Sequence, residues 1–166
     1  MANGIIAGVF TIVGVVLGVL LEPVKAAFLN RAHVRQERAD RCAALLEAVT
    51  LSSTWLITLN RQLRDESAGR KTSLEPAAYE RVTAEFVAAR QNMRKLVWLL
   101  RLSGPDDLAE AAEQVRSAES GLRELRQEPD DDDSGGRDGM PRAIRVARAQ
   151  LDTALGSFTD VARRHI

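Results

Sequence analysis

The chain opens with a long apolar stretch that contains no charged residue. Residues 4–21 (GIIAGVFTIVGVVLGVLL) form an unbroken uncharged run of 18, which as a helix spans about 27 Å at about 1.5 Å per residue. The hydrocarbon core of a bilayer is about 30 Å thick, and Leu, Ile, Phe and Val favour insertion at its centre. The pattern therefore predicts a transmembrane anchor over residues 1–22.

After this run the pattern changes to that of amphipathic helices. Apolar residues recur at alternating intervals of three and four in four segments, over about 23–65, 75–102, 106–128 and 141–165. Clusters of Pro, Gly and Ser separate the segments, and none shows the period-two alternation of a strand. We therefore expect an all-α fold, with a single transmembrane helix followed by an antiparallel four-helix bundle over residues 23–166.

The apolar seam of each segment predicts the bundle core. Ser52 is the one notable polar insertion, and we expect its hydroxyl to bond to a carbonyl of its own helix. The uncharged run between Glu47 and Arg61 has 13 residues, a length more typical of a buried core helix than of a second span. The other expected core residues are Cys42, Leu45, Val49, Leu56, Leu59 and Leu63, then Tyr79, Val82, Phe86, Ala89, Met93, Leu96 and Leu100, then Leu108, Ala111, Val115, Ala118, Leu122 and Leu125, then Ile144, Ala147, Leu151, Ala154, Phe158 and Val161.

Basic residues flank the uncharged run only on its C-terminal side. An excess of Lys and Arg marks the cytoplasmic side of a span, so we expect the N-terminus outside and the bundle in the cytoplasm. The content of 20 Arg and three Lys suggests a bacterial source and hence the plasma (inner) membrane. The lone Cys42 suits a reducing compartment. The basic residues nearest the run are Lys25, Arg31, Arg35, Arg38 and Arg41.

Two roles are open for the first four of these basic residues. If Pro23 bends the helix along the membrane surface, Lys25, Arg31, Arg35 and Arg38 all reach anionic lipid headgroups. If the helix leaves along the membrane normal, Arg35 lies about 21 Å beyond the run, more than two Debye lengths away. Lys25 alone then contributes, and the other three only set the topology.

One face of the expected span consists of small residues. Gly4, Ala7, Thr11, Gly14 and Gly18 recur at intervals of three and four. Small faces let two membrane helices approach closely. The stripe therefore predicts a homo-oligomer or packing on a partner membrane protein.

Groups suited to catalysis or metal binding are sparse. His33 and Cys42 lie about 13.5 Å apart along one helix, too far for a nucleophile and its base, and His165 is penultimate. The acidic segment 129–140 begins like a calcium loop, but Pro141 stands where a bidentate Glu is needed, so we expect a flexible linker. With 23 basic and 23 acidic residues, no general charge attracts nucleic acid. We expect no enzyme, no cofactor or metal, and no small-molecule substrate.

The sequence thus predicts a single-pass scaffold, adaptor or accessory subunit that works by binding proteins. One alternative is a secreted or periplasmic bundle cut after Ala26, although Met-Ala-Asn lacks the basic residue of a signal peptide and the apolar run is long for one. Another is a pore-forming or lysis-type oligomer, for which Thr11 is the only hydroxyl in the span.

Overall fold

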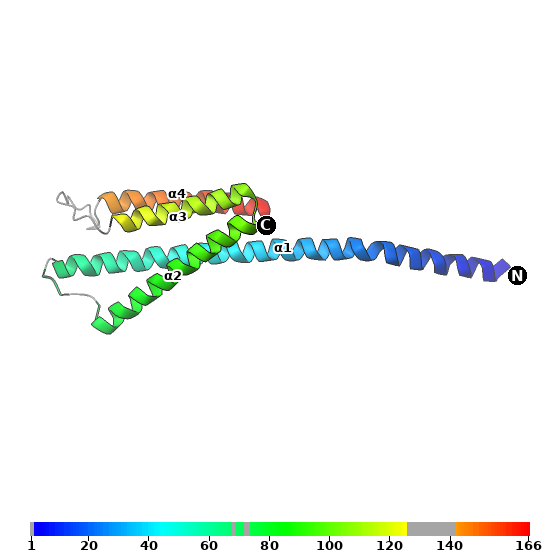
Figure 1. The fold of residues 1–166 in the computed structure, drawn as a ribbon, viewed down its shortest axis with the longest axis horizontal. Coiled ribbons are helices and arrows are strands. Elements are labelled where there is room, and N and C mark those ends of the chain that lie inside the picture. The colour runs from blue at the N-terminus through cyan, green and yellow to red at the C-terminus, as the bar shows by residue number, and fades with distance from the viewer. Residues whose placement is uncertain (1, 68, 72–73, 126–141) are drawn as a thin grey trace. The chain divides into compact units, whose positions relative to one another are not determined.

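A computed structural model describes residues 2–67, 69–71, 74–125 and 142–166, with side chains from Asn30 onward. These residues form helices and no strand, which confirms the all-α prediction (Figure 1). The helices are α1 (Ala2–Ser67), α2 (Pro76–Ser103), α3 (Asp106–Glu124) and α4 (Arg142–His165).

The first helix differs from the prediction. Pro23 suits either the first turn of a new helix or a kink after Leu21; no new helix begins there, because α1 continues through this residue to Ser67. Proline removes a single backbone hydrogen bond, and both the uncharged run before it and the amphipathic segment after it favour helix. The chain divides into two compact units, residues 1–37 and 38–166, and both contain part of α1.

The other helices begin within about one residue of their expected starts. Helix α3 ends earlier than expected, at Glu124, with Leu125 as its C-terminal cap. The acidic segment 129–140 lies outside the described residues.

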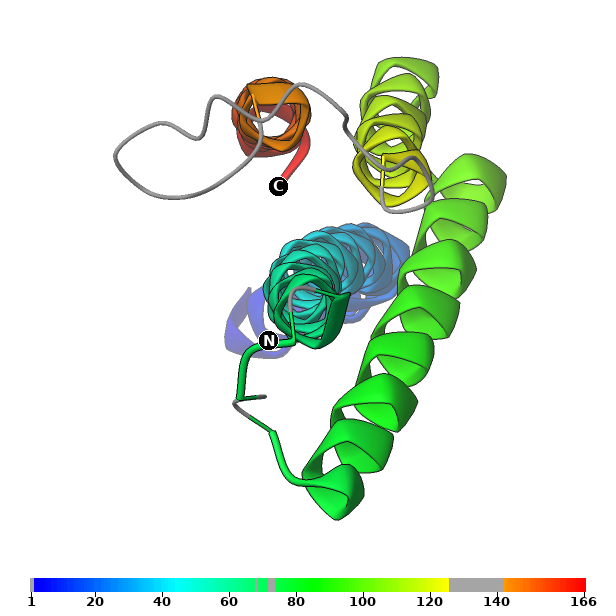
Figure 2. The ribbon, with the colours of Figure 1, turned by 90° about the vertical axis from the view of Figure 1, so that its left-hand side faces the viewer.

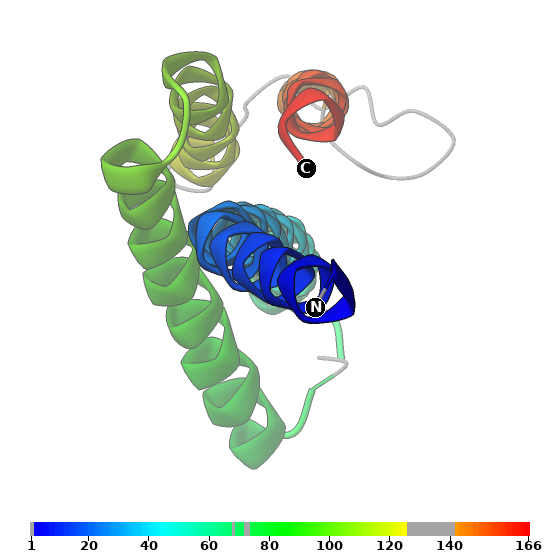
Figure 3. The same cartoon turned by 90° about the vertical axis from the view of Figure 1, so that its right-hand side faces the viewer.

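Within the second unit, successive helices run in opposite directions, and α3 lies beside α4 (Figure 1). Views along the bundle show α3 between α2 and α4, and all three around the part of α1 that follows residue 37 (Figures 2 and 3). Helix α2 crosses its neighbours obliquely. The bundle is therefore antiparallel.

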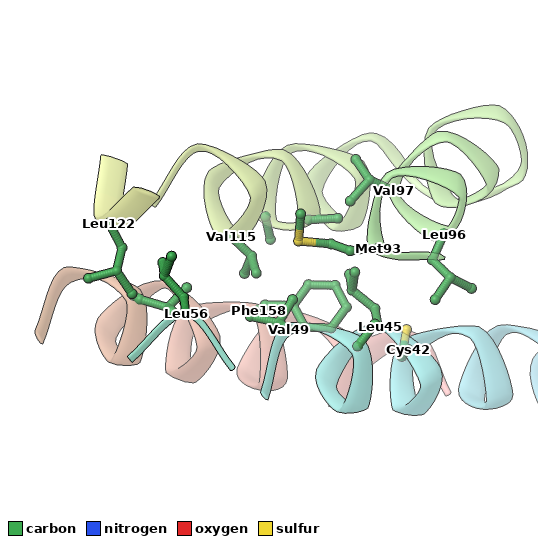
Figure 4. Packing of buried hydrophobic residues seen from close by; sticks show 14 of the residues in the cluster. Cys42, Leu45, Val49, Leu56, Met93, Leu96, Val97, Val115, Leu122 and Phe158 are labelled. Carbon is green, nitrogen blue, oxygen red and sulfur yellow. The ribbon is translucent and has the colours of Figure 1, made fainter. Parts of the chain in front are cut away.

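One apolar core joins the four helices. Phe158 of α4 is fully buried near Val49 of α1 and Met93 of α2 (Figure 4), and full burial of such side chains contributes about 1.5–3 kcal/mol each. The buried face is wider than a single seam, because it also includes residues beside the expected positions. These are Ala48, Val97, Ala112 and Ala162. The expected residues that are only partly buried are Leu63, Tyr79, Ala118, Leu125, Ala154 and Val161.

A tight cap ends α1. Gly69 has a φ of +64°, its backbone N–H donates to Glu66 O at 3.0 Å, and the N–H of Arg70 donates to Asp65 O at 2.8 Å. This pair of bonds is the Schellman motif, in which glycine takes the left-handed position. Buried Gln62 then holds the following loop, accepting from the N–H of Leu74 at 3.1 Å.

Two Gly→Ala substitutions are predicted to change stability in opposite directions. At Gly69 a Cβ is disfavoured by the left-handed backbone, so Gly69→Ala should lower the free energy of unfolding by about 1–2 kcal/mol. Gly121 lies within α3, where a Cβ would meet no atom within 4 Å. Gly121→Ala should raise the free energy of unfolding by about 0.5–1 kcal/mol. Denaturant unfolding of the full chain in mild detergent measures both, and equal effects would show that Gly69 does not need its left-handed conformation to end α1.

Candidate functional site

The structure describes only some of the residues predicted to face lipid or a membrane partner. The side chains of Gly4, Ala7, Thr11, Gly14, Gly18 and Lys25 lie outside the described residues. Arg31 and Arg35 are exposed. Arg38 is half-buried and donates from Nη1 to the backbone oxygen of His165 at 3.0 Å. This basic residue therefore stabilises the C-terminus of α4, where cations are favourable.

One helix near the N-terminus is long and apolar enough to cross a membrane. Among the residues with described side chains, the stretch that meets this criterion is Asn30–Ser67, which contains the uncharged run before Arg61. Its Leu45, Leu56 and Leu59 are fully buried in the bundle core, as expected for a core helix. The uncharged run at 4–21 lies outside the residues with described side chains.

A buried polar cluster joins three helices. Ser52 of α1 donates from Oγ to Glu119 Oε1 of α3 at 2.8 Å, and Arg90 of α2 donates from Nε to the same oxygen at 3.1 Å. Ser52 and Glu119 are fully buried, and the side chain of Arg90 is 16% exposed. The guanidinium of Arg90 also lies 5.7 Å from the ring centroid of Phe86, where a cation is attracted to the aromatic face.

The expectation that Ser52 bonds within its own helix was wrong. Thr50, Thr54 and Thr58 on the exposed side of α1 make such bonds, whereas Ser52 faces a carboxylate, which is a stronger acceptor. Sequence reasoning missed Glu119 because charged residues were left out of the core. Its position, between two core residues of α3 at helical spacing, was the available signal.

This cluster is expected to select one packing of the helices rather than to add much net stability. Burying two charges costs desolvation that their attraction only partly repays. In addition, Oε2 of Glu119 is buried without a hydrogen-bond partner in the described part of the chain. Ser52 and Arg90 can both donate to Oε1 of Glu119 only when α1, α2 and α3 pack in one register. Apolar contacts alone define that register less strictly.

A second polar cluster lies where α3 begins and α4 ends. Nε2 of His165 lies 2.8 Å from Oδ1 of Asp107, and Arg164 lies 3.9 Å from the same carboxylate. The hydrogen bond from His165, then its charge, the Leu108 N–H and Arg164, lower the pKa of Asp107. His165 therefore links the end of α4 to the start of α3.

The described residues offer little for catalysis. No group of three or more His, Cys, Asp or Glu side chains among them could hold a metal ion. Cys42 is buried in the core, and burial raises the pKa of its thiol although Arg38 opposes the shift. A thiol with a raised pKa remains protonated and is a poor nucleophile.

An apolar groove is lined by residues of α1 and α2. A groove of about 470 Å³, here called the α1–α2 groove, contains Leu51 and Trp55 of α1 and Ala88 of α2, with Glu47 and Glu85 at its edges. Leu51 is 43% exposed. Apolar side chains that are exposed in a groove favour the binding of an apolar partner. The groove is therefore a candidate protein-binding site.

The outer face of α2 carries a second hollow, of about 490 Å³. Further along the same helix, Trp98 is 59% and Leu102 64% exposed. Neither residue belongs to the apolar stripe of α2 that faces the core. Sequence reasoning, which followed that stripe, therefore did not single them out.

Comparisons with known proteins identify no relative. No protein-family model, curated protein or solved structure matches this chain. Its function must therefore be argued from the residues and surfaces described above.

The buried cluster predicts a large difference between single and paired substitutions. Arg90→Met leaves the carboxylate of Glu119 buried without its counter-charge, which should cost about 3–5 kcal/mol of stability. The double variant Arg90→Met/Glu119→Met removes both charges and should recover most of this loss. Denaturant unfolding of the full chain in mild detergent measures these values.

Arg116→Met is the matched control for this experiment. Arg116 pairs with Glu113 one turn away on α3, with both side chains partly exposed, so its loss should cost less than about 1 kcal/mol. A cost for Arg90→Met as small as that of the control would show that the buried pair does not constrain the bundle.

The lowered pKa of Asp107 predicts that the stability of the fold depends on pH. Its pKa is lower in the folded chain than the ordinary value of about 3.9, so the carboxylate stabilises the fold above that value. The stabilisation is lost as the pH falls through the lowered pKa. Asp107→Asn should therefore reduce the denaturation midpoint at about pH 6 and have little effect below the lowered pKa. Asp152→Asn, at an exposed site on α4, should show no such dependence, and parallel pH profiles for the two variants would contradict the assignment.

Proposed function

We propose that this protein is a single-pass membrane-anchored helical bundle that acts as a scaffold, adaptor or accessory subunit by binding proteins. The observation that carries the proposal is the α1–α2 groove, in which Leu51 of α1 and Ala88 of α2 are exposed. An exposed apolar groove favours the binding of an apolar segment from a partner protein. The edges at Glu47 and Glu85 favour a partner segment that combines apolar residues with basic ones.

The anchor is proposed from the uncharged run at residues 4–21. The basic residues that follow it support an N-terminus outside and a bundle in the cytoplasm, at the plasma (inner) membrane of a bacterium. The stripe of small residues within the run supports self-association or packing on a partner span. In this arrangement the anchor concentrates the bundle at the membrane, where its groove binds the partner.

Fractionation of cells that express the full chain, combined with intact mass, tests the anchor. We expect an uncut chain in the membrane pellet that resists high-salt and alkaline washing, because about 18 apolar residues hold it in the bilayer. A soluble chain beginning at Ala27 would instead indicate export after cleavage and would overturn the proposal.

The same membranes test binding. A photo-crosslinking residue at Leu51 should give a discrete protein adduct, which Trp55→Ala should weaken. The same residue at Thr153, which is exposed on α4, serves as the control and should give none. Equal labelling from both positions would show that the groove binds no partner.

A further inference from the structure

The outer face of α2 carries a projection and a hollow that fit each other. The hollow has small residues, Thr83, Ala84 and Ala88, with Val87 beside them. Trp98 projects from the same face, because eleven residues at about 100° each return to within about 20° of Val87. A large exposed aromatic side chain and an apolar hollow thus share one helix face.

Two copies of this face are complementary when the helices run antiparallel. In a two-fold pair centred on Gln91, Trp98 lies seven residues after the axis and therefore meets Ala84, which lies seven residues before it in the other copy. The symmetry makes the contact twice, as in any isologous interface. Gln91 is exposed, and its amide can bond to its own counterpart at the axis.

The charges along α2 favour the same arrangement. The hollow includes Glu80, whereas the half of the helix after Gln91 carries Arg94, Lys95 and Arg101 and no acidic residue. Arg101, ten residues after the axis, is level with Arg81 of the other copy and one residue from the level of its Glu80; Glu80 lies on the same helix face as Trp98, because 18 residues at about 100° each complete five turns, whereas Arg81 lies about 100° away from it. A parallel pair would instead place the three basic residues of each copy against those of its partner.

We propose that the outer face of α2 binds a second copy of this chain through the reciprocal insertion of Trp98 into the hollow beside Ala84. The occupant is a second copy because projection, hollow and opposite charges all lie on one face of one helix. This contact goes beyond the proposed function: it concerns the outer face of α2, which shares only Ala88 with the α1–α2 groove, and it does not depend on how the anchor packs.

Cysteine cross-linking of the full chain tests the geometry. Gln91→Cys should form a disulfide-linked dimer under mild oxidation, because the two residues meet at the axis within the distance a disulfide needs. Ala84→Cys should not, since its two copies lie about 21 Å apart along the helices. The chain with only its native Cys42, which is buried, should also remain uncross-linked.

Two further variants test the fit between projection and hollow. In the Gln91→Cys chain, Trp98→Ala removes the projection and Ala84→Arg fills the hollow, and each should lower the dimer yield at least about tenfold, as expected when a buried aromatic contact of an interface is lost. Val146→Ala alters an equally exposed apolar residue on α4 and should leave the yield unchanged. Because Ala84 and Trp98 are exposed, these variants should retain the helical circular dichroism of the parent chain.

Three results would overturn this proposal. Cross-linking at both position 84 and position 91 would indicate parallel packing, and an unchanged yield with Trp98→Ala would show that the projection is not used. Absence of a Gln91→Cys dimer, together with quenching of Trp98 by brominated lipid in a Trp55→Phe chain, would assign the face to the bilayer. Membrane extraction reports on the anchor and cross-linking on α2, so failure of one proposal is distinguishable from failure of the other.

Discussion

Burial of the apolar face of α1 is the constraint on which the rest of the bundle depends. Leu45, Val49, Leu56 and Leu59 are completely inaccessible to solvent, and each such side chain left exposed would cost about 1.5–3 kcal/mol. The same stretch is apolar enough to cross a membrane. The other three helices cover this apolar face, so a segment whose composition suits lipid is instead buried in the core of a helical bundle.

The buried charges of Arg90 and Glu119 have a different effect from this apolar burial. Leu and Val contacts gain energy in many neighbouring registers, because the interaction depends on area and has no direction. A carboxylate oxygen that accepts from both Ser52 and Arg90 has direction, and it connects α1, α2 and α3 at one height. The bundle therefore combines a non-directional driving force with one directional contact that distinguishes the native packing from shifted ones.

The sequence predicted the helices and most of the core, because spacing along one helix determines which residues share its face. It did not predict that Glu119 is buried, because the energy of burying a charge depends on a partner, Arg90, that lies on another helix. The continuation of α1 through Pro23 was missed for a related reason: a proline is a local signal, whereas the helix is favoured by residues on both sides of it. To predict contacts between helices one must know how the helices are placed relative to one another. The spacing of residues within one helix does not give this information.

Helix α2 has apolar residues on two faces, and only one of them is needed for the core. Met93 and Leu100 are buried against the other helices, whereas Val87, Trp98 and Leu102 point away from them. Replacing the second set with charged residues would leave the core contacts intact, so the fold itself does not require them. Exposed Trp and Leu also raise the risk of non-specific association. An apolar face that contributes nothing to the core and carries this cost is best explained by an interaction outside the bundle, and the hollow on the same helix is the reason that we propose a second copy as the partner.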